Sequence, residues 1–228
     1  MSGLPAPLYP GDLMRGCEEV LELFARYLVR FVDTGHTHYN ELVNDGRTIY
    51  ADARSTGQVE EGPPGFSIAV VDGDVVSWKF KARDEPGPFV QLTTPSDCRL
   101  ITAPASPTRL VRGACWMRAR VWSARVVISV GCVDGGPELA MEPATEVRLT
   151  WSCGVPGLGD GLHGITARAR DASGASADDA ITILVSQSGE YDRPARAADG
   201  SDADCVGVWP EKGILGTQLG PNKNRRKW

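Results

Sequence analysis

"CWMRARVW", residues 115–122, is the stretch that decides the fold, because its side chains alternate strictly between two kinds. Cys115 and every second residue up to Val121 are small or apolar, and tryptophans and arginines fill the positions between them. An alternation of period two predicts a β-strand with one face against a core. The period alone leaves two interpretations open. Either the tryptophans form one side of the core, or Trp116 and Trp122 lie outward, with the arginines, as an aromatic and cationic binding stripe.

The same pattern continues on both sides of this stretch. Turn-forming residues such as Asp134-Gly-Gly136 separate short runs that are rich in β-branched and aromatic residues. The predicted strands are Phe89–Thr93, Leu110–Trp122, Arg125–Val133, Glu138–Met141, Glu146–Trp151, Gly164–Arg170 and Ala180–Val185. About seven short strands without a competing helical pattern predict an immunoglobulin-like (Ig-like) or fibronectin-type β-sandwich over residues 89–186.

Residues 1–83 have a different pattern, which predicts an α/β segment. Apolar residues recur every three or four positions from Asp12 to Leu28, as on one side of a helix, and the Asp12 carboxylate can cap its first turn. Strands are expected at 28–32, 48–53, 66–71 and 75–81. Asp72-Gly73-Asp74 between the last two indicates a hairpin turn. The alternation in its second arm predicts one buried face and one wet face.

Two further segments lack regular patterns. Residues 84–88, Asp-Glu-Pro-Gly-Pro, are typical of a linker. Residues 187–228 lose periodicity and are expected to form an irregular tail, with Trp209, Ile214 and Leu215 pinned against another surface. The fold class expected from the whole sequence is therefore α/β plus all-β, with a partial α/β segment, a β-sandwich and a tail.

Composition limits the classes of partner. The 228 residues carry a net charge of −5 and 42% hydrophobic residues, so we expect a globular core and no general attraction to nucleic acid or to a membrane. The six cysteines form no C-x-x-C pair, which argues against a zinc ribbon. The N-terminal sequence has no secretory pattern and no window is apolar enough for a membrane span. These features predict a cytoplasmic location with free thiols.

Two of the three histidines, His36 and His38, flank one threonine directly after a predicted strand. Neutral imidazole is a common ligand of transition metals, so this loop is a candidate metal site. Polar residues that could add ligands there are Asp33, Asn40, Glu41 and Asp45, although loop polarity or turn formation explains each of them more simply. The third histidine, His163, falls in the predicted sandwich and is expected to be a strand-edge or loop residue.

Gly35-His36-Thr37-His38 resembles the Gly-His-x-His motif of the calcineurin-like metallophosphoesterases. The segments Asn44–Tyr50, Arg54–Gly57 and Glu61–Phe66 extend this resemblance to the C-terminal part of bacterial members related to cyclic-nucleotide phosphodiesterases, in which an Ig-like module follows. The resemblance implies a phosphoester substrate, divalent metal ions (Mn, Fe or Zn) and His36 and His38 as metal ligands. In such a centre two metal ions hold the ester and a bridging hydroxide.

The chain departs from that family pattern at its other metal motifs. Asp-x-His, Gly-Asp after a strand, Gly-Asn-His and a further histidine before Gly-His-x-His are all missing. Two imidazoles from one loop are too few ligands for two metal ions. We therefore expect a truncated or split metallophosphoesterase that is inactive alone, whose partner is the missing N-terminal portion. The helix and first strand would then leave apolar residues partly exposed, namely Val20, Leu21, Phe24 and Phe31.

Two other interpretations remain open from the sequence. The Ig-like region can serve as a binding or spacer module without catalysis, for which the tryptophan stripe is the candidate surface. Alternatively, the chain is a folded remnant with no activity.

Overall fold

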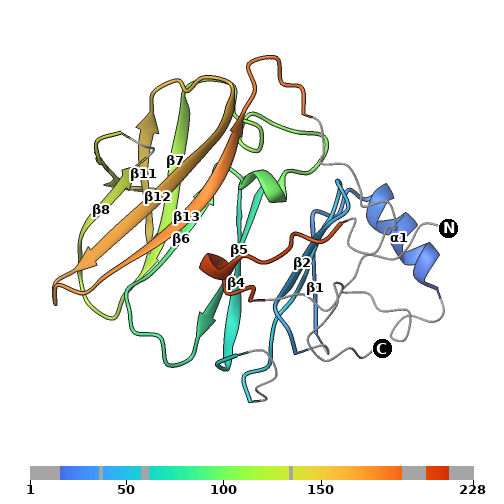
Figure 1. Cartoon of the computed structure of the whole chain (residues 1–228), viewed down its shortest axis with the longest axis horizontal. Helices are drawn as coiled ribbons and strands as arrows, with labels where there is room; N and C mark the ends of the chain where they lie inside the picture. Colours follow the sequence, from blue (N-terminus) through green and yellow to red (C-terminus); the bar gives the residue numbers. More distant parts are fainter. Residues whose placement is uncertain (1–15, 36–37, 58–61, 134–135, 192–203, 216–228) are drawn as a thin grey trace.

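The computed structural model describes residues 16–35, 38–57, 62–133, 136–191 and 204–215. These residues form a mostly β structure with one short α-helix and several antiparallel sheets (Figure 1). The prediction of β-sheets in residues 89–186 is confirmed at this level. Residues 1–83 show little of the predicted α/β structure. Their described part contains one helix and one parallel strand pair, and its other strand pairs are antiparallel.

The N-terminal sheet has three strands, β1 (Phe31–Thr34), β2 (Glu41–Asn44) and β3 (Ile49–Asp52), in the order β1-β3-β2. Strand β1 runs parallel to β3, and β2 runs antiparallel to it. Helix α1 (Cys17–Arg26) is shorter than predicted and ends just before Leu28, whose positive φ of 52° breaks the helical path. The first strand therefore begins at residue 31 instead of residue 28.

Helix α1 packs on this sheet through a small apolar contact. Leu21 and Phe24 meet Val43 and Tyr50, and the rings of Phe24 and Tyr50 lie 6.5 Å apart. The four residues expected to be partly exposed, Val20, Leu21, Phe24 and Phe31, are all half-buried. The predicted cap Asp12 lies outside the described residues.

The hairpin of β4 (Gly65–Asp72) and β5 (Val75–Ala82) confirms the predicted turn, in which Gly73 takes a positive φ of 63°. The prediction that one face of β5 is wet is wrong. Ser77 and Lys79 are buried because β5 also packs against the sandwich strand β6 (Phe89–Thr94), where the Gln91 amide donates a 3.0 Å hydrogen bond to the Ser77 hydroxyl. Both faces of β5 are therefore covered.

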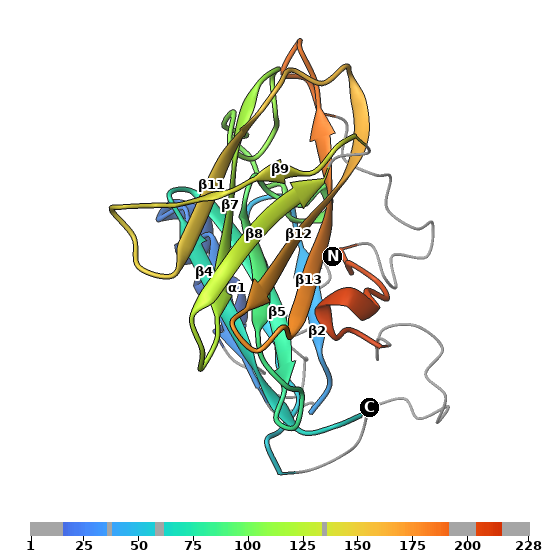
Figure 2. The same cartoon turned by 90° about the vertical axis from the view of Figure 1, so that its left-hand side faces the viewer.

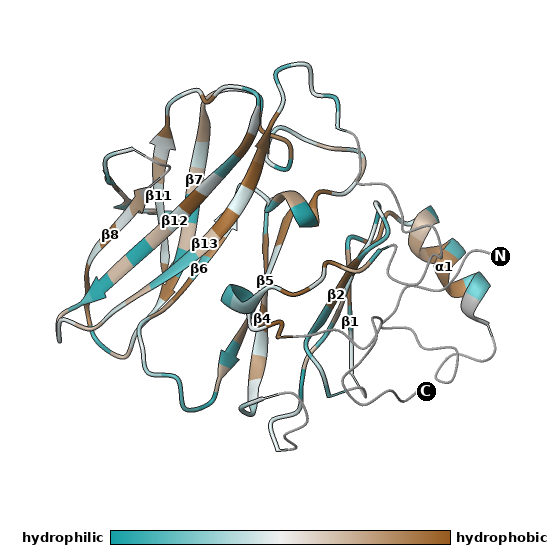
Figure 3. Ribbon diagram, in the orientation of Figure 1, coloured by the Kyte–Doolittle hydropathy of each residue, from teal (hydrophilic) through white to brown (hydrophobic). Residues whose placement is uncertain are grey.

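Two four-stranded antiparallel sheets form the sandwich. One has the order β10-β11-β7-β6 and the other β13-β12-β8-β9. The strands after β6 are β7 (Cys115–Trp122), β8 (Val127–Val133), β9 (Leu139–Ala140), β10 (Glu142–Pro143), β11 (Thr150–Val155), β12 (Gly161–Asp171) and β13 (Ser176–Val185). The sheets lie against each other (Figures 1 and 2), and apolar and polar segments alternate along β12 and β13 (Figure 3).

The structure decides which face of strand β7 lies against the core. Met117, Ala119 and Val121 are buried in the sandwich, and the Sγ of Cys132 lies 3.1 Å from the Sδ of Met117. Trp116, by contrast, is 67% exposed. At Trp116 this face is therefore the outer face of the sandwich, and the interpretation of Trp116 as a core residue is wrong, whereas Trp122 is half-buried.

The C-terminal segment 204–215 lies between the N-terminal sheet and the β4–β5 hairpin (Figure 1). Cys205 pairs with Val43 at the edge of β2, which covers that edge. A short 3₁₀ turn, η2 (Pro210–Lys212), follows Trp209, and the guanidinium of Arg99, in the 3₁₀ turn η1 (Cys98–Leu100), lies 3.4 Å from the Trp209 ring centroid. Trp209 is pinned as predicted.

Apart from Val43 and Tyr50, which pack with helix α1, one apolar cluster extends across the predicted parts of the chain. It joins Leu42 and Ile49 of the first sheet to Trp78 of the hairpin and Ile183 of the sandwich, and it includes Ile214. Leu215, also expected to be pinned, is exposed. The domain limits 1–83, 84–88, 89–186 and 187–228 stay predictions. The described part of the chain contains no helix with the length and apolarity needed to cross a membrane.

Replacing Trp209 by alanine is expected to lower the free energy of unfolding by about 3 to 5 kcal/mol, because the ring is almost completely buried and its loss leaves a cavity. Urea unfolding followed by circular dichroism measures this change. Val208→Ala is the control, since this neighbour is exposed and its loss should change the free energy by no more than about 0.5 kcal/mol. Equal effects of the two substitutions would contradict a core role for Trp209.

Candidate functional site

The candidate metal loop follows β1 at its carboxyl end. Gly35 is exposed there, and His38 is half-buried with a backbone φ of 61°, a left-handed conformation that side chains other than glycine adopt rarely. His36, the other histidine of the motif, lies outside the described residues. The structure thus places His38 in a loop directly after a strand, where the sequence predicted it.

Two buried carboxylic acids lie at the same end of the sheet. Glu41 of β2 and Asp52 of β3 are direct register partners, and Thr34 of β1 is the neighbour of Asp52 on its other side. Both acids are almost completely buried. The Thr34 hydroxyl donates a 2.9 Å hydrogen bond to the Ala51 carbonyl, which fastens the end of β1 to β3. Of the two acids, sequence reasoning named only Glu41.

Asn40 and Arg54 connect this end of the sheet to the C-terminal segment. The Asn40 amide donates a 2.9 Å hydrogen bond to the Gly213 carbonyl, and its oxygen accepts a 2.8 Å bond from the Arg54 backbone N–H. The Arg54 guanidinium donates to the same Gly213 carbonyl at 3.3 Å and lies 4.1 Å from the centroid of the Phe80 ring. Asn40 therefore holds the chain just after His38 in a fixed position.

The remaining sequence candidates have separate roles. Asp45 is a turn residue, because its carboxylate accepts 2.8 Å bonds from the backbone N–H groups of Arg47 and Thr48. Partial desolvation raises the pKa of Asp33, near the end of β1. His163 lies in β12, where its Nε2 atom is 2.8 Å from the Gly159 carbonyl oxygen. The structure does not bring Asp45 and His163 to the histidine loop as ligands.

The donor set can be compared with the needs of a two-metal centre. Such a centre needs a bridging carboxylate and several nitrogen and oxygen ligands. Within the residues that the structure describes, no three side chains of His, Cys, Asp or Glu lie close enough together to hold an ion. Adding His36 from the same loop supplies one more imidazole. The donors that the structure describes, even with His36 added, therefore do not fit a dinuclear centre, and we derive no chemical step through metal ions.

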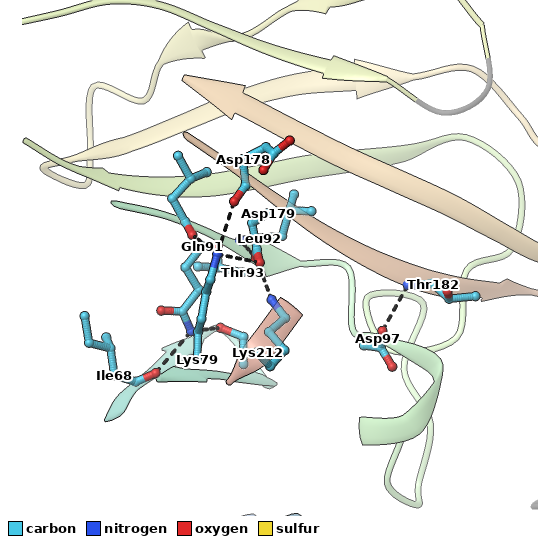
Figure 4. Close-up of polar contacts among 12 residues, drawn as sticks. Ile68, Lys79, Gln91, Leu92, Thr93, Asp97, Asp178, Asp179, Thr182 and Lys212 are labelled. Carbon is cyan, nitrogen blue, oxygen red and sulfur yellow. Dashed lines mark hydrogen bonds and ion pairs between the residues drawn. The ribbon is translucent and has the colours of Figure 1, made fainter. Parts of the chain in front are cut away.

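A second polar centre, which sequence reasoning missed, lies between the hairpin, the sandwich and the C-terminal segment (Figure 4). The buried Asp179 carboxylate of β13 contacts the Nζ atom of Lys79 at 2.9 Å and that of Lys212 at 2.5 Å. The Leu92 backbone N–H also donates to Asp179 at 2.7 Å. Full burial lowers the pKa of Lys212, and the nearby Asp179 carboxylate acts in the opposite direction. We name these three side chains, Lys79, Asp179 and Lys212, the buried ion triad.

Further hydrogen bonds fix the residues around the buried ion triad. Lys79 donates to the carbonyls of Val90 at 3.0 Å and Asp178 at 3.2 Å, so its ammonium is enclosed by acceptors. Asp97 accepts a 2.9 Å bond from the Thr182 backbone N–H farther along β13. The only sequence clue was a lysine in a largely apolar arm, Val75–Phe80, and alternation assigned it to water.

A groove with a cavity volume of about 670 Å³ opens on the outer face of the sandwich. It lies between the β4–β5 turn and strands β7, β10 and β11, and Trp116 lines it. The outward stripe that the sequence suggested is therefore part of a concave surface at Trp116. Trp122, the other tryptophan of the stripe, instead packs against Phe89 with 5.7 Å between ring centroids.

Comparisons with known proteins give distant matches. No protein-family model matches the sequence, and no curated protein matches it. Among solved structures, an endo-β-1,4-mannanase from Thermotoga petrophila matches with a TM-score of 0.36 and 13% identity, over 46% of this chain and 21% of that chain. A double mutant of a Cellulomonas fimi endo-β-1,4-mannanase matches with a TM-score of 0.27 and 22% identity, over 44% and 18%. An engineered protein matches with a TM-score of 0.29 and 21% identity, over 44% and 20%.

Each match spans about a fifth of the other protein. Matches of this kind assign neither a family nor an activity to this chain. The candidate sites therefore depend on the residues themselves.

Replacing Asp179 by asparagine is expected to lower the free energy of unfolding by about 3 to 5 kcal/mol, because two buried ammonium groups lose their counterion. Chemical denaturation measures the change. Asp178→Asn is the matched control: its side chain is exposed and its ion pair with Arg168 is long, 3.7 Å, so the expected change is at most about 1 kcal/mol. A similarly small effect for Asp179→Asn would mean that the triad does not stabilise the fold.

Proposed function

We propose that this chain contributes a Gly-His-x-His ligand loop to a calcineurin-like metallophosphoesterase centre whose other ligands come from outside it. Its activity in that assembly would be phosphoester hydrolysis with divalent metal ions, and the chain alone would be inactive. In this proposal residues 1–83 are the C-terminal portion of the phosphoesterase domain, and the sandwich that follows is Ig-like.

The observation that carries the proposal is the position of the loop. His38 follows the carboxyl end of β1, a strand that is parallel to its neighbour β3. Ligand loops in α/β sheets gather at the carboxyl ends of parallel strands, so this is a suitable place for an imidazole that completes a site. Asn40 fixes the chain on the far side of the loop through Arg54 and Gly213.

The two edges of the sheet add support. The β2 edge is covered by the C-terminal segment at Cys205, whereas β1, at the other edge, has β3 as its only strand neighbour among the described residues. An uncovered strand edge presents backbone donors and acceptors to which a further strand can pair. Additional strands at β1 would bring their own loops to the end of the sheet where His38 lies.

The proposal predicts weak metal binding that depends on the two histidines, without turnover. Titration of the purified chain with Mn²⁺, followed by electron paramagnetic resonance, is expected to show at most one weakly bound ion. Either substitution alone, His36→Ala or His38→Ala, is expected to abolish this binding. Hydrolysis of bis(p-nitrophenyl) phosphate with Mn²⁺ is expected to stay at the background rate, because two imidazoles cannot hold two ions.

His163→Ala is the matched control, since this imidazole lies in the sandwich strand β12. It should leave Mn²⁺ binding unchanged. Binding that survives both loop substitutions would remove the basis for a ligand loop. Turnover by the chain alone that His36→Ala abolishes would instead show that the chain carries a complete centre.

A further inference from the structure

The groove at Trp116 is lined by this indole and by polar side chains. Its cavity volume of about 670 Å³ lies within the usual range for small-ligand sites. The turn residues Asp72 and Asp74 line one side, and Glu146 and Ser152 belong to the other. Two segments that are distant in sequence therefore form its walls.

The Trp116 ring is open to ligands for a local reason. It stands on the outer face of β7, and its register partner on β11 is Gly154, which has no side chain to cover the ring. A Cβ atom at residue 154 would meet no other atom within 4 Å, so the space directly above Gly154 is open. An exposed indole of this kind is unusual on a surface and marks a candidate contact site.

The wall that contains the two aspartates is held by internal contacts, which largely compensate its charges. Asp72 contacts the Arg118 guanidinium at 2.9 Å and accepts hydrogen bonds from the hydroxyls of Thr93 at 2.8 Å and Thr94 at 3.0 Å. Both of its carboxylate oxygens are thus engaged within the protein. Its side chain and that of its partner Arg118 are largely buried, with 13% and 29% exposed, so the pair is a fixed feature of the wall.

Asp74 is held in the same way. Its carboxylate accepts a 2.6 Å hydrogen bond from the Thr108 hydroxyl and lies 3.4 Å from the Arg109 guanidinium. Partial desolvation acts to raise the pKa of Asp74, but hydrogen bonds from Ser106 and Thr108 and the Arg109 charge together lower it below its ordinary value. The groove therefore offers fixed polar atoms with little net charge from its two aspartates.

We propose that this groove binds a neutral saccharide, with one sugar ring stacked on Trp116. The C–H bonds on the face of a pyranose carry partial positive charge and suit the negative face of an indole ring. The sugar hydroxyls can donate to and accept from the polar wall atoms, which gives orientation. The wall carboxylates disfavour an anionic ligand, and their pairing with Arg118 and Arg109 weakens the attraction for a cationic one.

A glycan array probed with the intact chain tests the inference, followed by calorimetry with the best neutral oligosaccharide found. Trp116→Ala is expected to weaken binding by roughly tenfold or more, as for the loss of a central aromatic anchor. Trp116→Phe should restore part of the affinity, because a smaller aromatic face remains. Phe66→Ala is the matched control, since this aromatic ring is also exposed, on β4, and does not line the groove.

The charge of the ligand is tested separately with Glu146→Gln. Glu146 is an exposed residue of the groove, so its substitution should change the affinity for a neutral sugar by less than about threefold. The same substitution would strongly lower the affinity for a cationic ligand. Tetramethylammonium is the cationic probe. The proposal is overturned if no neutral glycan binds, if Trp116→Ala leaves glycan binding intact, or if tetramethylammonium binds in a Trp116-dependent way and glycans do not.

Discussion

The arrangement of the molecule depends on the contacts that the buried Asp179 carboxylate makes. It lies on β13 of the sandwich and holds Lys79 of the hairpin and Lys212 of the C-terminal segment at 2.9 and 2.5 Å. A buried carboxylate is tolerated only when charges and donors surround it, and the Leu92 backbone N–H supplies a further donor at 2.7 Å. Three parts of the chain that are far apart in sequence are thereby fixed to one another, and the continuous apolar cluster fills the space around them.

Both candidate sites depend on this packing. Gly213 directly follows Lys212, and its carbonyl accepts from Asn40 and Arg54 beside the histidine loop. The Trp116 groove needs the hairpin turn close to the outer face of β7, and the Asp72–Arg118 pair joins these two elements at 2.9 Å. A loop that presents a metal ligand and a groove that presents an indole are thus each held in place by contacts between distant parts of one molecule.

Much of the sandwich was predictable because several of its strands, such as β7, β12 and β13, carry their own alternation. The residues of β6, β8, β12 and β13 were located to within a few positions, and the hairpin turn at Gly73 was identified. The helix was found but overextended, since its pattern continues to Leu28 although the backbone turns there. Alternation misplaced Lys79, because the rule assumes that one face of a hairpin meets water, and here β6 and Asp179 occupy that face.

The sequence by itself determined the mostly β character of residues 89–186, the hairpin, and the placement of His38 after a strand, since these depend on short-range periodicity and turn chemistry. Only the tertiary structure decided which face of β7 is buried, that Trp209 and Lys212 belong to the interior, and that Asp179 and Lys79 meet. Local patterns carry no information about which distant segment will cover a given face. That choice is made by packing and by the need to compensate buried charge.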